Sequence, residues 1–325
     1  MVRRVVCREL NGPESMRLEE EPSRVLGPGQ VRVAIRACGV NFPDLLMTRG
    51  LYQLKPPLPF TPGFESAGDV VEVAPDVETV KPGARVITRH RYGGYADELV
   101  LTPDALLPLP ASFSYAEGAC FTVGYHTAYH ALVHRGHLKA GQVLLVHGAA
   151  GGVGLGAVEI GKLLGATVIA TGSSDEKLAV VRERGADHVI NYTRESFRER
   201  VKAITQDRGA DVIYDPVGGD VFDESLRCIA WQGRLLVIGF AGGRIPKLPA
   251  NLALLKGCAV VGVRAGEATR RNPALGKDSR EALMRLANSG ALRPNISHTL
   301  PLERFAEAMR VLSERKAVGR VALTT

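Results

Sequence analysis

Cysteine is scarce in this chain of 325 residues, and no long apolar run is present. The five cysteines are Cys7, Cys38, Cys120, Cys228 and Cys258. No two of them form a C-x-x-C pair and their number is odd, so neither a disulfide framework nor a four-cysteine zinc lobe is expected. Buried free thiols indicate a reducing, cytoplasmic location. Because no 18 apolar residues run together and the N-terminus lacks a signal-peptide core, no membrane association is expected.

Clustered charge of one sign is also absent. Lys and Arg number 41 against 34 Asp and Glu, which gives a net charge of +7 and a pI near 9.3. The charges are interspersed, and no run of five like charges occurs. Nucleic-acid binding usually requires a basic stripe or a recognisable module, and neither is found. We therefore expect a small-molecule partner rather than a nucleic acid.

Glycine, by contrast, is abundant, with 36 residues in the chain. That is about 11%, against an average near 7%. An excess of glycine in a globular chain indicates tight turns or close approaches of the backbone to a ligand.

The pattern of apolar residues changes along the chain. Residues 30–37, 65–73 and 94–101 alternate like half-buried strands between Pro- and Gly-rich turns. From residue 142 onward, apolar strands alternate with amphipathic helices, which is typical of a doubly wound parallel sheet. The expected strands are 143–146, 167–171, 188–190, 211–214, 233–238 and 259–263, and the expected helices between them are 152–164, 175–184, 195–205 and 221–229.

This organisation predicts an α/β fold with one domain inserted into another. A Rossmann domain is placed at residues 122–264. A β-rich domain would combine residues 1–121 with residues 265–325. Helices near 279–289 and 302–313 and a strand near 320–323 are expected in the last segment.

A glycine-rich turn follows the first strand of the predicted Rossmann domain. His147 precedes a segment of the form A-x-G-x-x-G that opens a helix. Glycines there allow the backbone to approach a pyrophosphate, and the helix N-terminus stabilises the anion. We expect this turn to hold a dinucleotide through Ala149, Gly151, Gly152, Val153 and Gly154.

The end of the second strand indicates which dinucleotide is bound. Enzymes that use NAD usually place Asp or Glu there, for the ribose 2′-hydroxyl. Here the segment is Thr171-Gly172-Ser173-Ser174, with Lys177 one turn further on. Ser173, Ser174 and Lys177 suit a 2′-phosphate, so NADPH is predicted over NADH. The loops after the fourth and fifth strands should complete the site through Val217, Gly218, Gly239, Phe240 and Ala241.

Several segments of the chain resemble the motifs of a known family. They are Gly39–Asp44, Arg49–Tyr52, Pro59–Gly68, the Ala149–Gly154 turn, Gly185–Tyr192 and Asp215–Gly219. Across essentially the whole chain, the sequence resembles the zinc-free quinone oxidoreductase (zeta-crystallin-like) branch of the medium-chain dehydrogenases/reductases. The resemblance implies that the β-rich domain is GroES-like.

The resemblance also bears on metal binding. Zinc-dependent relatives hold a catalytic metal with Cys, His and Cys, and the matching positions here are Asn41, Phe64 and Val123. These side chains supply neither a thiolate nor an imidazole. His126, His130 and His134 recur at four-residue spacing, but they are interpreted as solvated or core residues. No metal is expected.

The resemblance implies a catalytic site formed by Asn41, Asp44 and Tyr52. Asn41 would contact the substrate carbonyl or the nicotinamide amide, and Tyr52 would contact a developing oxyanion or a substrate ring. Thr127 and Tyr192 match cofactor-contacting positions, with Tyr192 near the adenine or 2′-phosphate. Where some relatives carry a second tyrosine, this chain has Leu46.

Two arginines near the C-terminus, Arg315 and Arg320, are open alternatives for contacting the cofactor phosphate. Each has a competing interpretation as an ordinary surface arginine.

The predicted function is an NADPH-dependent, quinone oxidoreductase-type reductase that passes hydride to a quinone or an α,β-unsaturated carbonyl. The alternatives are an enoyl-thioester or alkenal reductase, and an NADPH-binding structural or RNA-contacting protein with little turnover. The resemblance also implies a homodimer, with the apolar segment 259–263 as the candidate edge strand.

Overall fold

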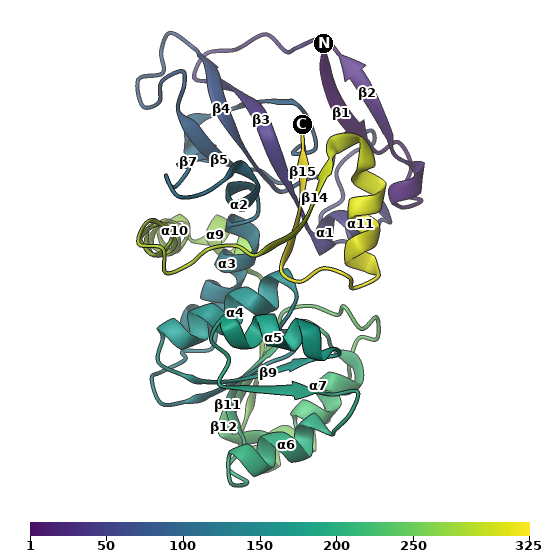
Figure 1. Cartoon of the computed structure of the whole chain (residues 1–325), viewed down its shortest axis with the longest axis vertical. Helices are drawn as coiled ribbons and strands as arrows, with labels where there is room; N and C mark the ends of the chain where they lie inside the picture. The colour runs from purple at the N-terminus through teal and green to yellow at the C-terminus, as the bar shows by residue number, and fades with distance from the viewer. The chain divides into compact units, whose positions relative to one another are not determined.

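The computed structural model describes all residues, 1–325, and they form two compact units (Figure 1). Unit 1 comprises Met1–Val123 and Ala287–Thr325, and unit 2 comprises Gly124–Leu286. Residues 265–286, which the sequence assigns to the β-rich domain, cluster with unit 2. Hydrogen bonds explain this placement, since Thr269 and Ser279 bond to His126 and His134 within unit 2.

Unit 1 is β-rich. Its main sheet has the order β14-β15-β3-β4-β5-β7, with β6 also paired to β3. A separate antiparallel pair is formed by β1 and β2. The strands are β1 Val2–Val6, β2 Arg17–Glu21, β3 Val31–Val40, β4 Glu65–Val73, β5 Arg85–Arg89, β6 Glu98–Leu101, β7 Leu106–Pro108, β14 Ile296–Pro301 and β15 Arg320–Thr324. The helices are α1 Phe42–Thr48, α2 Tyr115–Ala119 and α11 Phe305–Ser313, with 3-10 turns Pro13–Ser15, Pro103–Ala105 and Leu302–Arg304.

The core of unit 1 follows the predicted alternation. Val31, Val33 and Ile35 on β3 are all buried, as the period of two requires for a strand with one face inward. β4 occupies residues 65–73 as predicted, whereas β6 begins only at Glu98. The C-terminal strand β15 pairs with β3, so the two ends of the chain build one sheet.

Unit 2 contains a parallel six-stranded sheet with the order β10-β9-β8-β11-β12-β13. In chain order this is 3-2-1-4-5-6, the arrangement of a doubly wound dinucleotide-binding fold. The strands are β8 Val143–Val146, β9 Thr167–Gly172, β10 His188–Asn191, β11 Ala210–Asp215, β12 Ile229–Val237 and β13 Ala259–Gly262. The order reverses between β8 and β11, and ligands of such sheets bind at this point.

Helices connect these strands (Figure 1). They are α4 Gly152–Leu163, α5 Asp175–Glu183, α6 Phe197–Ile204, α7 Gly219–Ser225, α8 Ala250–Lys256, α9 Ala265–Arg271 and α10 Pro273–Asn288. The unit begins on α3 Thr122–Tyr129, which continues as the π-helical segment His130–Arg135. The helix expected to reach residue 229 ends at Ser225, because Ile229 pairs with Ala210 in the sheet.

The predicted fold class is confirmed, with a parallel Rossmann-type sheet inserted into a β-rich unit. None of the helices combines the length and the apolar character that crossing a membrane would take.

Candidate functional site

The glycine-rich turn lies between β8 and α4 at the reversal point of the sheet. α4 begins at Gly152, and its first intrahelical bond runs from Leu155 N to Gly151 O at 2.8 Å. The N–H groups of the first turn of α4, those before Leu155, therefore have no partner within the helix. A Cβ atom on Gly154 would stand 2.3 Å from Gly148 O, so only glycine fits there. The turn has the form that a pyrophosphate requires.

The loops after β11 and β12 are joined to each other. Ala241 N donates to Pro216 O at 3.0 Å, and Gly242 N donates to Val217 O at 2.8 Å. A Cβ atom on Gly218 would lie 2.9 Å from the Phe240 ring. The predicted residues Val217, Gly218, Gly239, Phe240 and Ala241 are thus brought together.

Contacts of Gly148 connect these loops to the glycine-rich turn. A Cβ atom on Gly148 would lie 3.4 Å from Val217 and 3.5 Å from Pro216. We call the turn Gly148–Gly154 and the loops Asp215–Gly218 and Gly239–Gly243 the cradle. Its three parts follow β8, β11 and β12, at the carboxyl ends of these strands.

Two buried groups hold the cradle, and sequence reasoning assigned neither a role in the site. The Asp215 carboxylate is 1% exposed and accepts from Val217 N at 2.8 Å and Gly218 N at 2.9 Å. Burial raises the pKa of Asp215, although these two N–H donors oppose the shift. The carboxylate therefore fixes the shape of the loop after β11.

The second buried group is His147, which links two strands and a helix. Its Nδ1 lies 2.9 Å from Thr171 Oγ1, and its Nε2 lies 2.8 Å from Ser225 Oγ. Because Ser225 donates its proton to Val221 O at 2.6 Å, we assign the N–H to Nε2 and the acceptor role to Nδ1. Burial lowers the pKa of His147 to about 3, so the ring is neutral.

The end of β9 carries the residues predicted to select the cofactor. Ser173 is exposed, and Ser174 caps α5 by accepting from Lys177 N at 3.3 Å. Tyr192 is 41% exposed, and its N–H donates to Gly172 O at 3.1 Å. The structure therefore places these predicted residues around one strand end.

An arginine that sequence reasoning missed also lies there. Asp175 accepts from Asn191 Nδ2 at 2.6 Å and forms an ion pair with Arg194 at 2.6 Å. Asp175 is the first carboxylate after the end of β9, and both of its contacts are made with Asn191 and Arg194 of the same unit. The sequence signal for Arg194 was only its position two residues after Tyr192.

Thr127 lies half-buried on α3. On the same helix, the Tyr125 hydroxyl donates to Glu159 of α4 at 2.5 Å. Helix α3 thus packs on the helix that begins at the glycine-rich turn.

In unit 1, Asn41 belongs to a buried hydrogen-bond network. Its Oδ1 accepts from Arg320 Nη2 at 2.8 Å, and its Nδ2 donates to Gly39 O and Glu65 Oε1, each at 3.3 Å. Arg320 also forms an ion pair with Glu65. Both amide hydrogens of Asn41 are used within the protein and one lone pair of Oδ1 accepts from Arg320, so the second lone pair of Oδ1 is what it offers a ligand.

Arg320 and Arg315, the two alternatives for the cofactor phosphate, lie in different settings. Arg320 is 7% exposed and is committed to Asn41 and Glu65. Arg315 is exposed after α11, with a positive φ of 56°. The guanidinium of Arg320 is therefore occupied by contacts within unit 1, whereas the side chain of Arg315 is exposed.

Asp44 is fully buried and surrounded by donors. Its carboxylate accepts from Asn41 N at 2.9 Å, Gly63 N at 2.9 Å and the Tyr95 hydroxyl at 3.1 Å. Burial raises the pKa of Asp44 to about 7, although all three donors oppose the shift. The carboxylate also completes the capping box of α1, which gives it a structural role.

Tyr52 is half-buried, and its ring meets the edge of Phe64 at a centroid distance of 5.9 Å. Phe64 and Val123, which match metal positions of zinc-dependent relatives, carry no donor atom on their side chains. No group of three or more His, Cys, Asp or Glu side chains is arranged to hold a metal ion.

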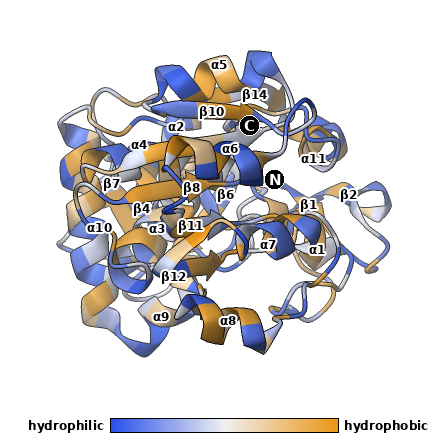
Figure 2. Ribbon diagram, turned by 90° about the horizontal axis from the view of Figure 1, so that it is seen from below, coloured by the Kyte–Doolittle hydropathy of each residue, from blue (hydrophilic) through white to orange (hydrophobic).

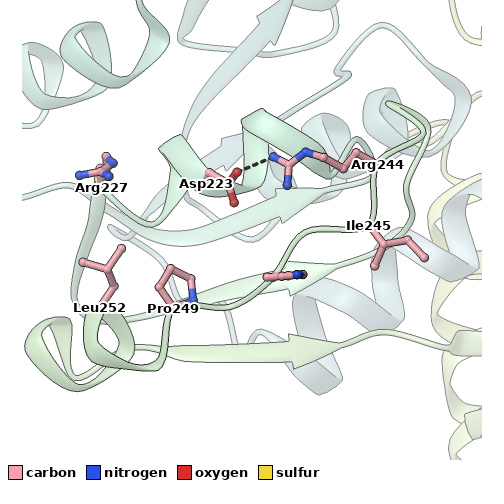
Figure 3. A pocket seen from close by; sticks show the side chains of 7 residues that line it. Asp223, Arg227, Arg244, Ile245, Pro249 and Leu252 are labelled. Carbon is pink, nitrogen blue, oxygen red and sulfur yellow. Dashed lines mark hydrogen bonds and ion pairs between the residues drawn. The ribbon is translucent and has the colours of Figure 1, made fainter.

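A pocket of about 500 Å³ lies beside the cradle loop that follows β12 (Figure 3). Arg244 on its wall bonds to Asp223 and, at 2.8 Å, to Asp220. The Arg244 carbonyl also accepts from Gly219 N at 3.1 Å. Arg244 therefore braces this loop against α7, the helix that follows the neighbouring cradle loop.

Comparisons with known proteins agree with this geometry. Residues 27–111 match the alcohol dehydrogenase GroES-like domain, and residues 152–284 match the zinc-binding dehydrogenase model. The chain is 41% identical to a quinone oxidoreductase-like protein 2 homolog of Nematostella vectensis, over 99% of this chain and 89% of that protein.

It belongs to the medium-chain dehydrogenase/reductase family. Two solved structures of similar proteins cover essentially the whole chain. The quinone oxidoreductase of Pseudomonas syringae has a TM-score of 0.90 at 31% identity and covers 100% of both chains. A mycobacterial protein complexed with NADPH has a TM-score of 0.90 at 29% identity and covers 99% of this chain and 100% of that one. The chain is similar to quinone oxidoreductase-like proteins, and it is an oxidoreductase with a dinucleotide-binding fold.

Proposed function

We propose that this chain is an NADPH-dependent reductase that transfers hydride to a quinone or an α,β-unsaturated carbonyl compound without zinc. The observation that carries the proposal is the cradle, whose three glycine-containing parts meet where the strand order reverses. The close packing of Gly154 against Gly148 shapes the turn, and the first N–H groups of α4, which have no partner within the helix, fit a pyrophosphate. When bound, the nicotinamide supplies the hydride.

The end of β9 supports NADPH rather than NADH. A carboxylate facing the ribose would repel a 2′-phosphate, but Asp175 is held by Asn191 and Arg194. Lys177 and Arg194 contribute positive charge at the same strand end. The similar mycobacterial protein, whose structure was solved in complex with NADPH, agrees with this choice.

In unit 1 the proposed substrate contacts have distinct chemical properties. Asn41 is held by Arg320 and Glu65, so its Oδ1 can accept a hydrogen bond while its amide hydrogens stay within the protein. The Tyr52 hydroxyl can donate to a developing oxyanion and can pass on a proton. Water is the other proton source. Asp44 holds the start of α1, which carries Asn41 as its N-cap.

The cofactor choice is tested with 2′,5′-ADP and 5′-AMP as binding probes. The wild-type protein should bind 2′,5′-ADP more tightly. The double variant Lys177→Ala/Arg194→Ala should weaken 2′,5′-ADP binding by about a hundredfold, since two charge-assisted contacts are lost. Binding of 5′-AMP should change little. Arg182→Gln, an exposed arginine on α5, is the matched control and should leave both affinities unchanged. Equal or tighter wild-type binding of 5′-AMP would contradict the choice of NADPH.

The acceptor class is tested by following NADPH oxidation against quinones, enals and enoyl thioesters. We expect the highest kcat/KM with a quinone or an enone. A preference for the enoyl thioesters would favour the alternative reductase. If NADPH binds but no acceptor is reduced, the chain is an NADPH-binding protein with little turnover.

We also propose a cytoplasmic homodimer. All five cysteines are free thiols, which suits a reducing compartment. One edge of the parallel sheet is β13, and the helix before it, α8, exposes Leu254 at 80% and Leu255 at 69%. Figure 2 shows α8 with orange, hydrophobic stretches along its ribbon. An apolar surface beside an open strand edge favours association with a second copy.

A further inference from the structure

A second cavity in unit 2 shares no residue with the cradle. It has a volume of about 560 Å³ and is lined by the π-helical segment, the end of β13 and the helices α9 and α10. Its lining side chains include cations, histidines and apolar groups. None of them is among the residues predicted to bind the dinucleotide.

His130 is a buried histidine in the lining of this cavity. It is 4% exposed and lies between His126 and His134, with ring centroids at 6.4 Å and 5.6 Å. Those two neighbours are bonded to Thr269 at 3.2 Å and Ser279 at 3.0 Å. The His130 ring makes no hydrogen bond to another residue and instead lines the cavity. An imidazole at a cavity wall offers a ligand one N–H donor and one acceptor nitrogen.

The charge of the lining favours an anion. Arg135 and Arg264 both line the cavity, and the acid among the lining residues is Glu267. Glu267 forms ion pairs with Arg270, with Arg271 at 2.9 Å and, more loosely, with Arg264 at 3.9 Å. Three arginines therefore face this one carboxylate, and the local charge stays positive. Burial lowers the pKa of His130 to about 4, which leaves a neutral ring with one N–H donor.

Two backbone features occur in the same segment. Residues His130–Arg135 form a π-helix, a rare conformation that is frequently found at functional sites. His137, also on the cavity wall, has a positive φ of 44°, which is uncommon for a residue with a side chain. The segment thus departs from regular helix where it meets the cavity.

We propose that this cavity binds a small organic anion, a carboxylate or phosphate carried on a short apolar body. Arg135 and Arg264 would hold the anionic group, and the His130 N–H would donate to it. Val133, Ala268 and Leu275 on the same wall would cover the apolar part. The site is separate from the cradle, so its occupancy does not depend on the proposed cofactor.

The test is titration of the full-length protein with octanoate, octyl phosphate and inorganic phosphate. Binding is followed through the imidazole NMR signals, with His130 assigned by comparison with His130→Phe. We expect octanoate or octyl phosphate to shift the His130 and His134 signals saturably, and the tighter of the two identifies the anionic group. Inorganic phosphate, which lacks the apolar body, should bind at least about tenfold more weakly, or about 1.4 kcal/mol.

Variants of the cavity provide the second readout. Arg135→Gln/Arg264→Gln should weaken octanoate or octyl phosphate binding at least tenfold, whereas Arg182→Gln should not change it. His130 signals that stay in place with both organic anions would overturn the proposal. Binding that is equally tight in Arg135→Gln/Arg264→Gln would overturn it too. Because the signals followed belong to His130 and His134, which lie outside the cradle, neither outcome depends on reductase activity.

Discussion

Single residues in this oxidoreductase make buried polar contacts that connect distant positions of the chain. His147 joins the ends of β8 and β9 to α7, and Arg320 joins β15 to Asn41 and Glu65. Each contact satisfies a buried polar group that would otherwise destabilise the fold. Substitution of His147 should therefore change how the free energy of unfolding depends on pH.

His147 provides a pH-dependent test of this idea. Its pKa is lowered to about 3 in the fold, against about 6.5 for an unfolded histidine. The stabilising contribution is present above pH 6.5 and is lost as the pH falls towards 3, because the unfolded chain takes up a proton first. At pH 4.5 the loss reaches about 3 kcal/mol.

His147→Gln removes this titration. Between pH 7 and pH 4.5, urea unfolding should show the wild-type protein losing about 2 to 3 kcal/mol more than the variant. The variant is expected to start from a lower stability at pH 7, since glutamine replaces the ring bonds only in part. Parallel pH curves for the two proteins would show that His147 is not neutral in the fold.

Sequence reasoning reached some of these residues and not others. The cradle residues follow strand ends, and strand ends are visible as the limits of apolar runs. The roles of Asp215, His147 and Arg194 depend on partners that are brought close only by folding. Asn41 and Arg320 are 279 positions apart in the sequence. No local sequence pattern could therefore show that Arg320 is buried against Asn41 whereas Arg315 is exposed.

At the scale of elements, the glycine-rich turn is the part of the site most constrained by backbone geometry. Gly154→Ala would place a methyl group 2.3 Å from Gly148 O, so the turn or α4 must move. We expect NADPH affinity to fall at least about tenfold and stability to fall by about 1 to 3 kcal/mol.

Gly266→Ala on α9 is the matched glycine substitution. Its Cβ atom would have only Arg270 within 4 Å, at 3.9 Å, and its φ is not positive. Alanine should stabilise this helix by about 0.5 to 1 kcal/mol and leave NADPH binding unchanged. For both variants, isothermal titration calorimetry measures the NADPH affinity and thermal unfolding measures the stability. Unchanged affinity in Gly154→Ala would contradict the proposed pyrophosphate site.

Elements differ in how well the sequence predicts them. β8 and β4 have the predicted limits, because their apolar residues are buried in the sheet. Helix α8 was not predicted, and the structure gives the reason, since none of its residues is buried. A helix without a buried face lacks the 3.6-residue apolar period on which such predictions depend.

At the scale of the whole molecule, the proposed dimer explains the exposed apolar groups of α8. Leu254→Glu/Leu255→Glu places two charges on that surface. The variant should be monomeric by light scattering at micromolar concentration, while the wild-type protein should have the mass of a dimer. Leu163→Glu, which changes another exposed leucine on α4, should remain dimeric. A monomeric wild-type protein would remove the basis for this interface.

The pairing of β15 with β3 has a consequence for synthesis on the ribosome. Every residue of unit 2 is made before β15 emerges, so unit 2 can fold while the sheet of unit 1 still lacks a strand beside β3. During that interval the nascent chain exposes an open strand edge next to the apolar residues of the unit 1 core. Newly made chains would then be prone to aggregation, and in need of a chaperone, until β15 emerges.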